Sequence, residues 1–527
     1  MNGAAAEGAW RPQANPWAIA LVVTLATFME VLDTTIVNVS LPYIAGSMSS
    51  SNDESTWTLT SYLVANGIVL PISGWLSNLF GRKRYFLICV AAFTVFSLAC
   101  GLATSLSQLI VFRLLQGFFG GGLQPSQQAI VLDTFPREQR SRAFGVVMMA
   151  VVVAPVIGPT LGGWLTDNFN WRWVFLINVP VGIVTFISVA QLVEDPPWLK
   201  TLRDKQRSAG IDYVGLSLIA LGLGALQVVM DRGEDEDWFG SRFIIIFAVL
   251  AGIGILGASV WLWSAKNPVV NLRLLKDRNF AVGCLLMFCL GGILYSSAVI
   301  IPELAQIVLG YTSFLAGLLL SPGAVLVILT VPIVVSLMPH VQTRFIVAFG
   351  FAALGLALVY SYRITPNVDF LTLLLMRTAQ SFGLAFLFVP ISTIAFATLP
   401  QEVNNDATAL FTMFRNVAGS IGISAATSFV TERTQVRMAH MVPHLTPLDP
   451  GFGALLSQRM ETLRAMGTAP AMLEKTALGS IEQTLVTQAS ITAYMDVFAY
   501  TALICFAVMW LAFLFSPVKG SAVPAGH

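Results

Sequence analysis

Charged residues are scarce in this sequence: Asp, Glu, Lys and Arg make up 11% of its 527 residues, against 56% apolar residues. Soluble domains carry roughly 25% charged residues, so the composition excludes an ordinary water-soluble protein. The net charge is only +1, and the basic residues do not gather on one face, so nothing indicates a nucleic-acid partner. The chain must be in contact with a lipid bilayer.

Motifs for metals and nucleotides are also missing. The four histidines and five cysteines show no metal-ligand spacing and no disulfide framework. No Gly-rich loop with a following Lys is present to hold phosphate groups. We therefore expect no metal, no cofactor and no enzymatic activity, and ATP is excluded as the energy source.

Long apolar runs of roughly 18 to 28 residues recur along the chain, and each is long enough to cross a bilayer as a helix. Because only helices satisfy every backbone group in lipid, we predict an all-α, polytopic fold. The start, Met1 to Pro16, lacks the features of a signal peptide, so the first apolar run is expected to remain as a span. Fourteen spans are predicted near residues 17–45, 57–79, 85–104, 107–135, 141–165, 172–192, 212–230, 242–264, 280–302, 313–338, 345–362, 369–398, 407–430 and 490–515.

The distribution of basic residues predicts the orientation of these spans. With the N-terminus inside, the inner segments hold seventeen Lys and Arg, and the short outer loops hold only four, namely Arg172, Arg232, Arg242 and Arg363. This asymmetry obeys the positive-inside rule and places both termini in the cytoplasm. A missed span would invert every later loop, so the pattern also supports the count.

An internal repeat divides the chain into two bundles. Leu109, Arg113 and Gln116 recur with the same spacing as Leu373, Arg377 and Gln380, and each Arg lies 23 residues before a Pro. Such parallel repeats are typical of transporters with two six-helix bundles. Spans 7 and 8 then form an insertion outside the two-bundle core. The predicted parts are the N-terminal tail 1–16, the first bundle 17–193, a basic linker with two inserted spans 194–279, the second bundle 280–515, and the C-terminal tail 516–527.

The connection between the last two spans is unusually long. About sixty residues, 431–488, lie on the outer side and include helix-forming stretches. Connections of this length are commonly functional or disordered.

Two carboxylates in the first span are the leading functional candidates. Glu30 and Asp33 are three positions apart, which places them on one helix face deep in the membrane. Charges at that depth are costly and mark ion or proton pathways. A carboxylate in a low-dielectric site can load and release a proton, so we predict a proton site with Arg113 as the cation that modulates it. The alternative is a purely structural pairing with a buried Arg.

Four further polar residues in the spans are candidates for substrate binding or coupling: Asn38, Gln116, Arg377 and Arg415. A guanidinium keeps its proton, so the two arginines cannot carry protons themselves. A structural role in anchoring the second bundle is equally compatible with their positions.

Two segments have compositions suited to conformational change. The fifth span contains Pro155, Gly158, Pro159, Gly162 and Gly163, in which the prolines remove helix hydrogen bonds and the glycines permit close helix contact. It is expected to form a bendable, tightly packed seam, although a simple packing kink would have the same composition.

A short turn joins spans 2 and 3 on the cytoplasmic side. It contains Gly74, Asn78, Gly81, Arg82 and Lys83, whose cations can pair with helix C-termini. The alternative is that its charges only set the topology.

On these motifs the chain resembles the major facilitator superfamily, and within it the fourteen-span drug:proton antiporters of the EmrB/QacA type. Residues 32–42 are similar to the first-span signature of that family, residues 154–163 to its antiporter motif, and residues 109–121 to its Arg-centred fourth-span motif. The resemblance implies proton coupling through Asp33 and Arg113. The turn at 74–84 departs from the usual pattern, because Asn78 stands where an acidic residue is expected.

The resemblance is strongest to the EmrB branch of Gram-negative bacteria. It implies an inner-membrane exporter, driven by the proton gradient, of drugs, detergents, bile salts, uncouplers or fatty acids. It further implies a periplasmic adaptor and an outer-membrane channel as partners, with 431–488 docking the adaptor. Two alternatives remain from the residues alone: a proton-coupled nutrient symporter of the same fold, and a membrane scaffold or sensor.

Overall fold

The computed structural model describes residues 12–199, 201, 204, 211–362, 364, 368–444 and 450–516. Within these ranges the chain is helical and has no strand, which confirms the all-α prediction. Of the described helices, twelve are long and apolar enough to cross a membrane, and the bent helix α7 (Arg140–Asn168) makes a thirteenth. The more polar α18 (Asn404–Met441) packs against α3, α13 and α20 and covers the predicted span 407–430. Most of the predicted tails and of the basic linker lies outside the described residues.

The first bundle is built from the spans before the linker. It contains α1 (Pro16–Ile36), α3 (Asn52–Phe80), α4 (Arg82–Leu102), α5 (Leu106–Gly120) continued by α6 (Leu123–Thr134), α7, and α8 (Trp173–Leu176) continued by α9 (Asn178–Leu192). The predicted first span, 17–45, is too long: α1 ends at Ile36, and a 3-10 turn leads into the separate short helix α2 (Leu41–Met48). Ser51 and Glu54 then form a capping box that starts α3.

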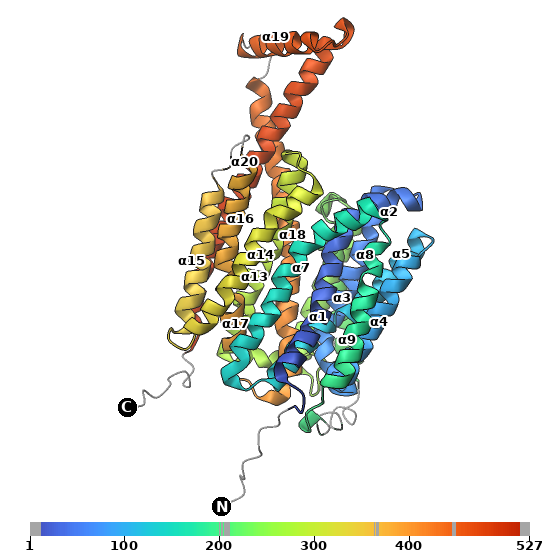
Figure 1. Ribbon diagram of the computed structural model, residues 1–527, viewed down its shortest axis with the longest axis vertical. Helices are drawn as coiled ribbons and strands as arrows, with labels where there is room; N and C mark the ends of the chain where they lie inside the picture. Colours follow the sequence, from blue (N-terminus) through green and yellow to red (C-terminus); the bar gives the residue numbers. More distant parts are fainter. Residues whose placement is uncertain are drawn as a thin grey trace, which may run out of the picture.

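The second bundle repeats this arrangement. It contains α13 (Arg278–Glu303), α14 (Ser313–Leu337), α15 (Thr343–Ser361), α16 (Phe370–Ala385) continued by α17 (Phe388–Ala395), α18, and α20 (Leu473–Leu511). The fourth span of each bundle is broken into two helices at the corresponding place, α5–α6 and α16–α17. The bundles meet where α7 packs on α14 and where α18 packs on α3 and α6 (Figure 1).

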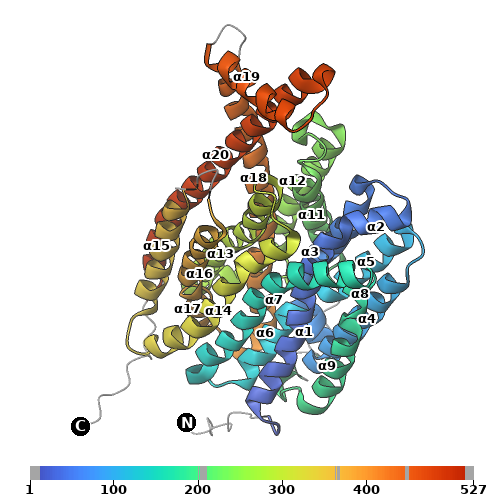
Figure 2. The ribbon, with the colours of Figure 1, turned by 45° about the horizontal axis from the view of Figure 1, so that its top comes forward.

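The inserted helices are α11 (Tyr213–Arg232) and α12 (Arg242–Ser264). They form the predicted insertion beside the two bundles, and α11 packs on α3 of the first bundle and on α18 of the second (Figure 2). Asp231 accepts a hydrogen bond from Thr60, and Gln227 accepts one from Ser420 at 3.0 Å. The polar residues of α11 therefore tie it to both bundles, and only α12 is peripheral.

The turn after α11 adds a contact to the second bundle. Trp238 donates hydrogen bonds from its indole nitrogen to Glu234 and Ser428, both at 3.0 Å, and Ser428 also donates to Glu234. Burial opposes ionisation of Glu234, but the hydrogen bonds from Ser428 and Trp238 outweigh it and lower the pKa of this carboxyl.

The long outer connection is a helical projection rather than a loop. α18 continues to Met441 and α20 begins at Leu473, so both helices extend well past the predicted span ends at 430 and 490. With α19 (Pro450–Ala465) they form what we call the stalk, the described residues between 431 and 488 (Figure 1). An ion pair between Arg437 and Asp496, 2.9 Å long, joins the two long helices at its base.

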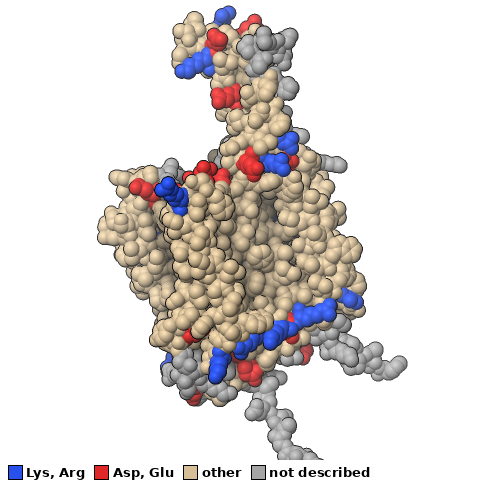
Figure 3. Space-filling view, turned by 180° about the vertical axis from the view of Figure 1, so that it is seen from behind, with Lys and Arg blue, Asp and Glu red and all other residues tan. Residues whose placement is uncertain are grey.

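The two ends of the molecule differ in charge. α1 begins and α20 ends at the same end, opposite the stalk, and we call this the basic end. Figure 3 shows a row of Lys and Arg along it, while the flanks between the ends are almost free of charge. This belt of uncharged surface is what a bilayer requires.

A prediction concerns the packing of α12 on α11. A Cβ atom at Gly254 would lie 2.3 Å from the backbone nitrogen of Gly222, whereas a Cβ at Gly252 has open space. Gly254→Leu should therefore force the two helices apart and cost about 1–3 kcal/mol of stability. Thermal unfolding of the purified protein measures this, with Gly252→Leu as the control that stays at the native melting temperature. Equal melting temperatures for both variants would contradict the packing.

Candidate functional site

A buried ion pair lies in the middle of the first bundle. Nη1 of Arg113, on α5, is 2.6 Å from Oδ2 of Asp33, on α1, and neither side chain is exposed. Removing either partner would leave an isolated charge in a low-dielectric interior. The structure thus brings together the carboxylate and the cation that the sequence singled out.

The free oxygen of Asp33 is also satisfied. Gln116 donates to Oδ1 from 3.1 Å and Asn178 from 2.7 Å, and Asn178 also donates to Ser97 at 3.0 Å. The carboxylate therefore has three side-chain donors, from α5 and α9. Such a set fixes its position and holds its charge away from water.

The position of Arg113 depends on the close approach of α3. Its Nε donates to the carbonyl of Thr58 at 3.1 Å, and its guanidinium lies 4.2 Å from the centre of the Tyr62 ring. α3 can come this near because a Cβ at Gly117 would lie 2.3 Å from the carbonyl oxygen of Tyr62. Glycine in α5 therefore allows the backbone of α3 to serve as a ligand of the arginine.

Glu30 lies one turn from Asp33 and has its own partners. Gln124 donates to Oε2 at 2.5 Å, Asn66 donates to Oε1 at 3.1 Å, and the hydroxyl of Tyr62 is 3.5 Å away. Tyr62 therefore contacts both carboxylate sites, through its hydroxyl on one side and its ring under Arg113 on the other. The two acids are neighbours that share one aromatic residue.

Gln124 also connects the two bundles. Its carbonyl oxygen accepts a hydrogen bond from Arg415 of α18, while its amide donates to Glu30. Arg415 is fully buried and lies 5.9 Å from the ring of Phe388. The predicted candidate Arg415 is thus one residue removed from Glu30, and any movement between the bundles changes this contact.

The other predicted polar candidates have different surroundings. Gln116 belongs to the Asp33 site, as described above. Arg377 lies in the second bundle, where it donates to Ser297 at 3.0 Å. Asn38 is exposed in the 3-10 turn after α1 and has no side-chain hydrogen bond to the carboxylate sites in the described structure.

The Pro- and Gly-rich segment lies on α7 between the bundles. A Cβ at Gly158 would lie 2.1 Å from Oγ1 of Thr35, and one at Gly162 would lie 2.7 Å from the carbonyl of Ile36, so both glycines pack α7 tightly on α1. α7 bends by 41° where Pro155 interrupts it. Pro159 lies inside the same helix, and Gly163 is buried. On its other side this part of α7 packs on α14, where a Cβ at Gly317 would lie 2.2 Å from Oγ1 of Thr160.

The shape of the 74–84 turn is set by its glycines. Gly81 has a φ of 91°, a left-handed conformation that favours glycine, and it ends α3. Gly74 faces the second bundle so closely that a Cβ would lie 2.8 Å from the carbonyl oxygen of Asn405. The backbone nitrogen of Lys83 donates to Asp195 at 2.8 Å.

The polar residues of the turn reach across to the second bundle. Asn78 donates to Asp406 of α18 at 3.1 Å and accepts a hydrogen bond from Asn405, while the buried Arg82 forms an ion pair with Asp133 of α6. The acidic residue missing at position 78 is therefore supplied from the other bundle, by Asp406. This contact joins the two bundles at the basic end.

Several residues of the site were missed by sequence reasoning: Tyr62, Asn66, Gln124, Asp133, Asn178 and Asp406. The polar run from Gln124 to Gln128 was a usable signal, because it interrupts an apolar span. The others are single polar residues in spans or at span ends, and only the packing of the helices shows what they contact.

No cluster of His, Cys, Asp or Glu in the described part of the chain could hold a metal ion.

Two pseudo-repeated six-helix bundles, a buried carboxylate between helices and an uncharged belt define a polytopic membrane transporter. Residues 23–423 match the family model of the Major Facilitator Superfamily, and the chain belongs to that superfamily. It is 36% identical to the multidrug export protein EmrB of Escherichia coli K12, over 96% of each chain.

Two further comparisons extend the likeness. The chain is 32% identical to the fatty acid resistance protein FarB of Neisseria gonorrhoeae, over 94% of this chain and 95% of that one. Its fold is similar to that of the human organic anion transporter MFSD10, with a TM-score of 0.57, 14% identity, and coverage of 94% of this chain and all of the other. The latter likeness concerns the fold alone.

A prediction concerns the turn at the basic end. Asn78→Asp should weaken the contact between the bundles, because Asp406 loses its amide donor and gains a carboxylate neighbour. We expect a loss of about 1–3 kcal/mol in thermal unfolding of the purified protein. The double variant Asn78→Asp/Asp406→Asn exchanges the two groups and should recover most of the native stability. A double variant as unstable as the single one would contradict the assigned contact.

Proposed function

We propose that this chain exports drugs and other hydrophobic or amphipathic molecules in exchange for protons. Multidrug export follows from membership of the superfamily together with extensive identity to a multidrug export protein. The observation that carries the proton part is the Asp33–Arg113 pair, which is fully buried and is hydrogen-bonded by residues of α3, α5 and α9. Burying a charge pair at this depth costs more than apolar packing of the same helices would, which favours a role in proton transfer beside its structural one.

The mechanism uses Asp33 as the proton acceptor. A proton on Asp33 cancels its charge and weakens its attraction to Arg113, which loosens α1 from α5. Glu30 responds to the same change through Tyr62, and through Gln124 it is connected to Arg415 of the second bundle. Protonation is thus converted into a change at the contact between the bundles, and α7 is the seam along which they move.

The orientation follows from the distribution of charge. The basic end is placed in the cytoplasm by the positive-inside rule, with both termini on that side and the stalk outside. The membrane in question is the bacterial inner membrane, so the stalk extends into the periplasm. Substrates then move from the cytoplasm or the inner leaflet towards the stalk side.

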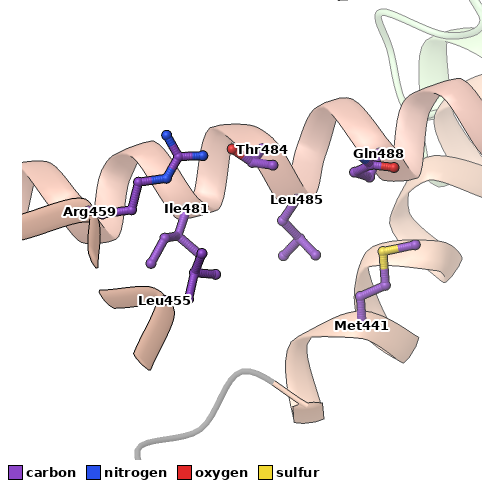
Figure 4. Close-up of a pocket in the computed structure, with 7 residues that line it drawn as sticks. All are labelled: Met441, Leu455, Arg459, Ile481, Thr484, Leu485 and Gln488. Carbon is purple, nitrogen blue, oxygen red and sulfur yellow. The ribbon is translucent and has the colours of Figure 1, made fainter. Parts of the chain in front are cut away.

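The stalk is the proposed docking site for a periplasmic adaptor that leads to an outer-membrane channel. An apolar groove of ≈ 350 Å³ lies between the end of α18, α19 and α20 (Figure 4). Met441, Leu455, Ile481 and Leu485 form its apolar wall, and Arg459 lies at one side. A groove of this shape suits an apolar helix face with an acidic residue at its edge.

The first test measures proton-driven transport. In proteoliposomes with an imposed proton gradient, the native chain should move a fluorescent amphipath, and Asp33→Asn should reduce transport to the level of empty vesicles. Asp496→Asn removes a carboxylate from the Arg437 pair at the stalk base and serves as the matched control, with native transport expected. Native transport by Asp33→Asn would refute this proton site but leave export standing.

The second test separates docking from transport. Leu485→Asp places a charge in the stalk groove and should abolish drug resistance in cells while leaving transport in proteoliposomes unchanged. Met466→Asp changes a stalk residue that is 76% exposed and not part of the groove, and resistance should persist. Resistance that survives Leu485→Asp, or is lost equally with Met466→Asp, would count against adaptor docking in the groove.

A further inference from the structure

The second bundle contains an incomplete copy of the proton site. Arg377 of α16 donates to Ser297 of α13 at 3.0 Å and to Gln380 at 3.3 Å, and Gln380 donates to Ser361 at 3.0 Å. Each residue lies 264 positions after its equivalent in the first bundle: Asp33 and Ser297, Ser97 and Ser361, Arg113 and Arg377, Gln116 and Gln380. The arginine, the glutamine and the serine are repeated, but the carboxylate is replaced by a hydroxyl.

As a result Arg377 lacks the counter-charge that its equivalent has. Arg113 is paired with Asp33, and Arg415 is separated from Glu30 by a single glutamine. No carboxylate in the described structure lies within 4.0 Å of Arg377, and its Nε–H has no acceptor there. A buried guanidinium with an unused donor is unfavourable in an apolar bundle unless an anion reaches it.

The copy also differs slightly in burial. Asp33, Arg113 and Gln116 have no exposed surface, whereas Arg377 is 5% exposed and Ser297 is 8% exposed. The side chains of the second site are therefore buried slightly less completely than those of the first. A ligand can approach the second site without breaking an existing ion pair.

We propose that Arg377, held in place by Ser297 and Gln380, binds the acidic group of anionic amphipathic substrates. The ligand's carboxylate takes the place that Asp33 occupies in the first bundle and accepts the free Nε–H of Arg377. The apolar part of the ligand remains among the helices of the bundle. This assignment rests on the proposed export function and gives Arg377 a part in substrate selection.

The structure suggests a specific test, because the missing carboxylate can be restored. Ser297→Asp gives Arg377 an internal partner and should exclude an external one, while Ser297→Asn adds similar bulk without charge. Dodecanoate and dodecyltrimethylammonium serve as anionic and cationic probes with the same alkyl chain. Binding of radiolabelled probes to the full-length protein in nanodiscs gives the dissociation constants.

We expect Ser297→Asp to weaken dodecanoate binding by at least about tenfold, since a charge-assisted hydrogen bond to the ligand is lost. Ser297→Asn alters the same site without adding a charge, so its loss of dodecanoate affinity should be clearly smaller than that of Ser297→Asp, and in Ser297→Asp the loss should be larger for dodecanoate than for the cation. The melting temperature of Ser297→Asp should equal or exceed the native value, because the buried charge is now paired. Weaker dodecanoate binding together with an unchanged or higher melting temperature would show that Arg377 binds the ligand and is not merely structural.

Three outcomes overturn the assignment. These are native dodecanoate binding by Ser297→Asp, equal losses in both variants, and absence of dodecanoate binding to the native protein. Transport of dodecyltrimethylammonium in proteoliposomes tests the proposed export function separately. If the native chain transports the cation while any of these outcomes holds, only the role of Arg377 fails. If it transports neither probe, the export function fails as well.

Discussion

The buried contact between Asp33 and Arg113 is the interaction on which the rest of this structure depends. An ion pair without exposed surface in a membrane bundle is stable only if polar groups surround both charges, and here they bind both oxygens of Asp33 and the Nε and Nη1 atoms of Arg113. Gln116 and Asn178 bind the carboxylate, while the Thr58 carbonyl and the Tyr62 ring bind the guanidinium. The close packing of α3 on α5 at Gly117 follows from the same requirement.

From this centre, contacts lead to the boundary between the bundles. Tyr62 touches Glu30, Glu30 is bound by Gln124, and Gln124 is bound by Arg415 on α18. α18 also carries Asp406, which meets Asn78 at the basic end, and Ser428, which meets Glu234 near the stalk. One helix of the second bundle therefore contacts the first bundle, the inserted helix α11 and the stalk. This explains why α18 is the most polar of the spans.

The sequence predicted the helices, the two-bundle repeat and the residues of the central pair, because these leave local or periodic signals. Apolar runs give the spans, and the recurring Arg and Gln give the repeat. It did not predict the role of α11, because a contact such as Gln227 with Ser420 joins residues 193 positions apart. The stalk was taken for a connection because its helices are polar, so the apolar runs end long before the helices do.

For a related reason, the sequence could not predict which residue supplies the acidic group that is missing at position 78. Asn78 departs from the pattern of the family, and local sequence cannot show that Asp406, 328 positions away, lies against it. The repeat itself held a further signal, since the spacing that relates Arg113 to Arg377 also relates Asp33 to Ser297. Among the described residues, that difference between the bundles leaves Arg377 without the carboxylate partner that Arg113 has.

The central claim is that Asp33 exchanges its proton when substrate binds. The most direct measurement is proton release from the purified protein in a weakly buffered solution, followed with a pH indicator as dodecyltrimethylammonium is added. The account predicts that the native chain releases protons on binding and that Asp33→Asn binds the same probe without release. Equal proton release from both proteins would contradict it.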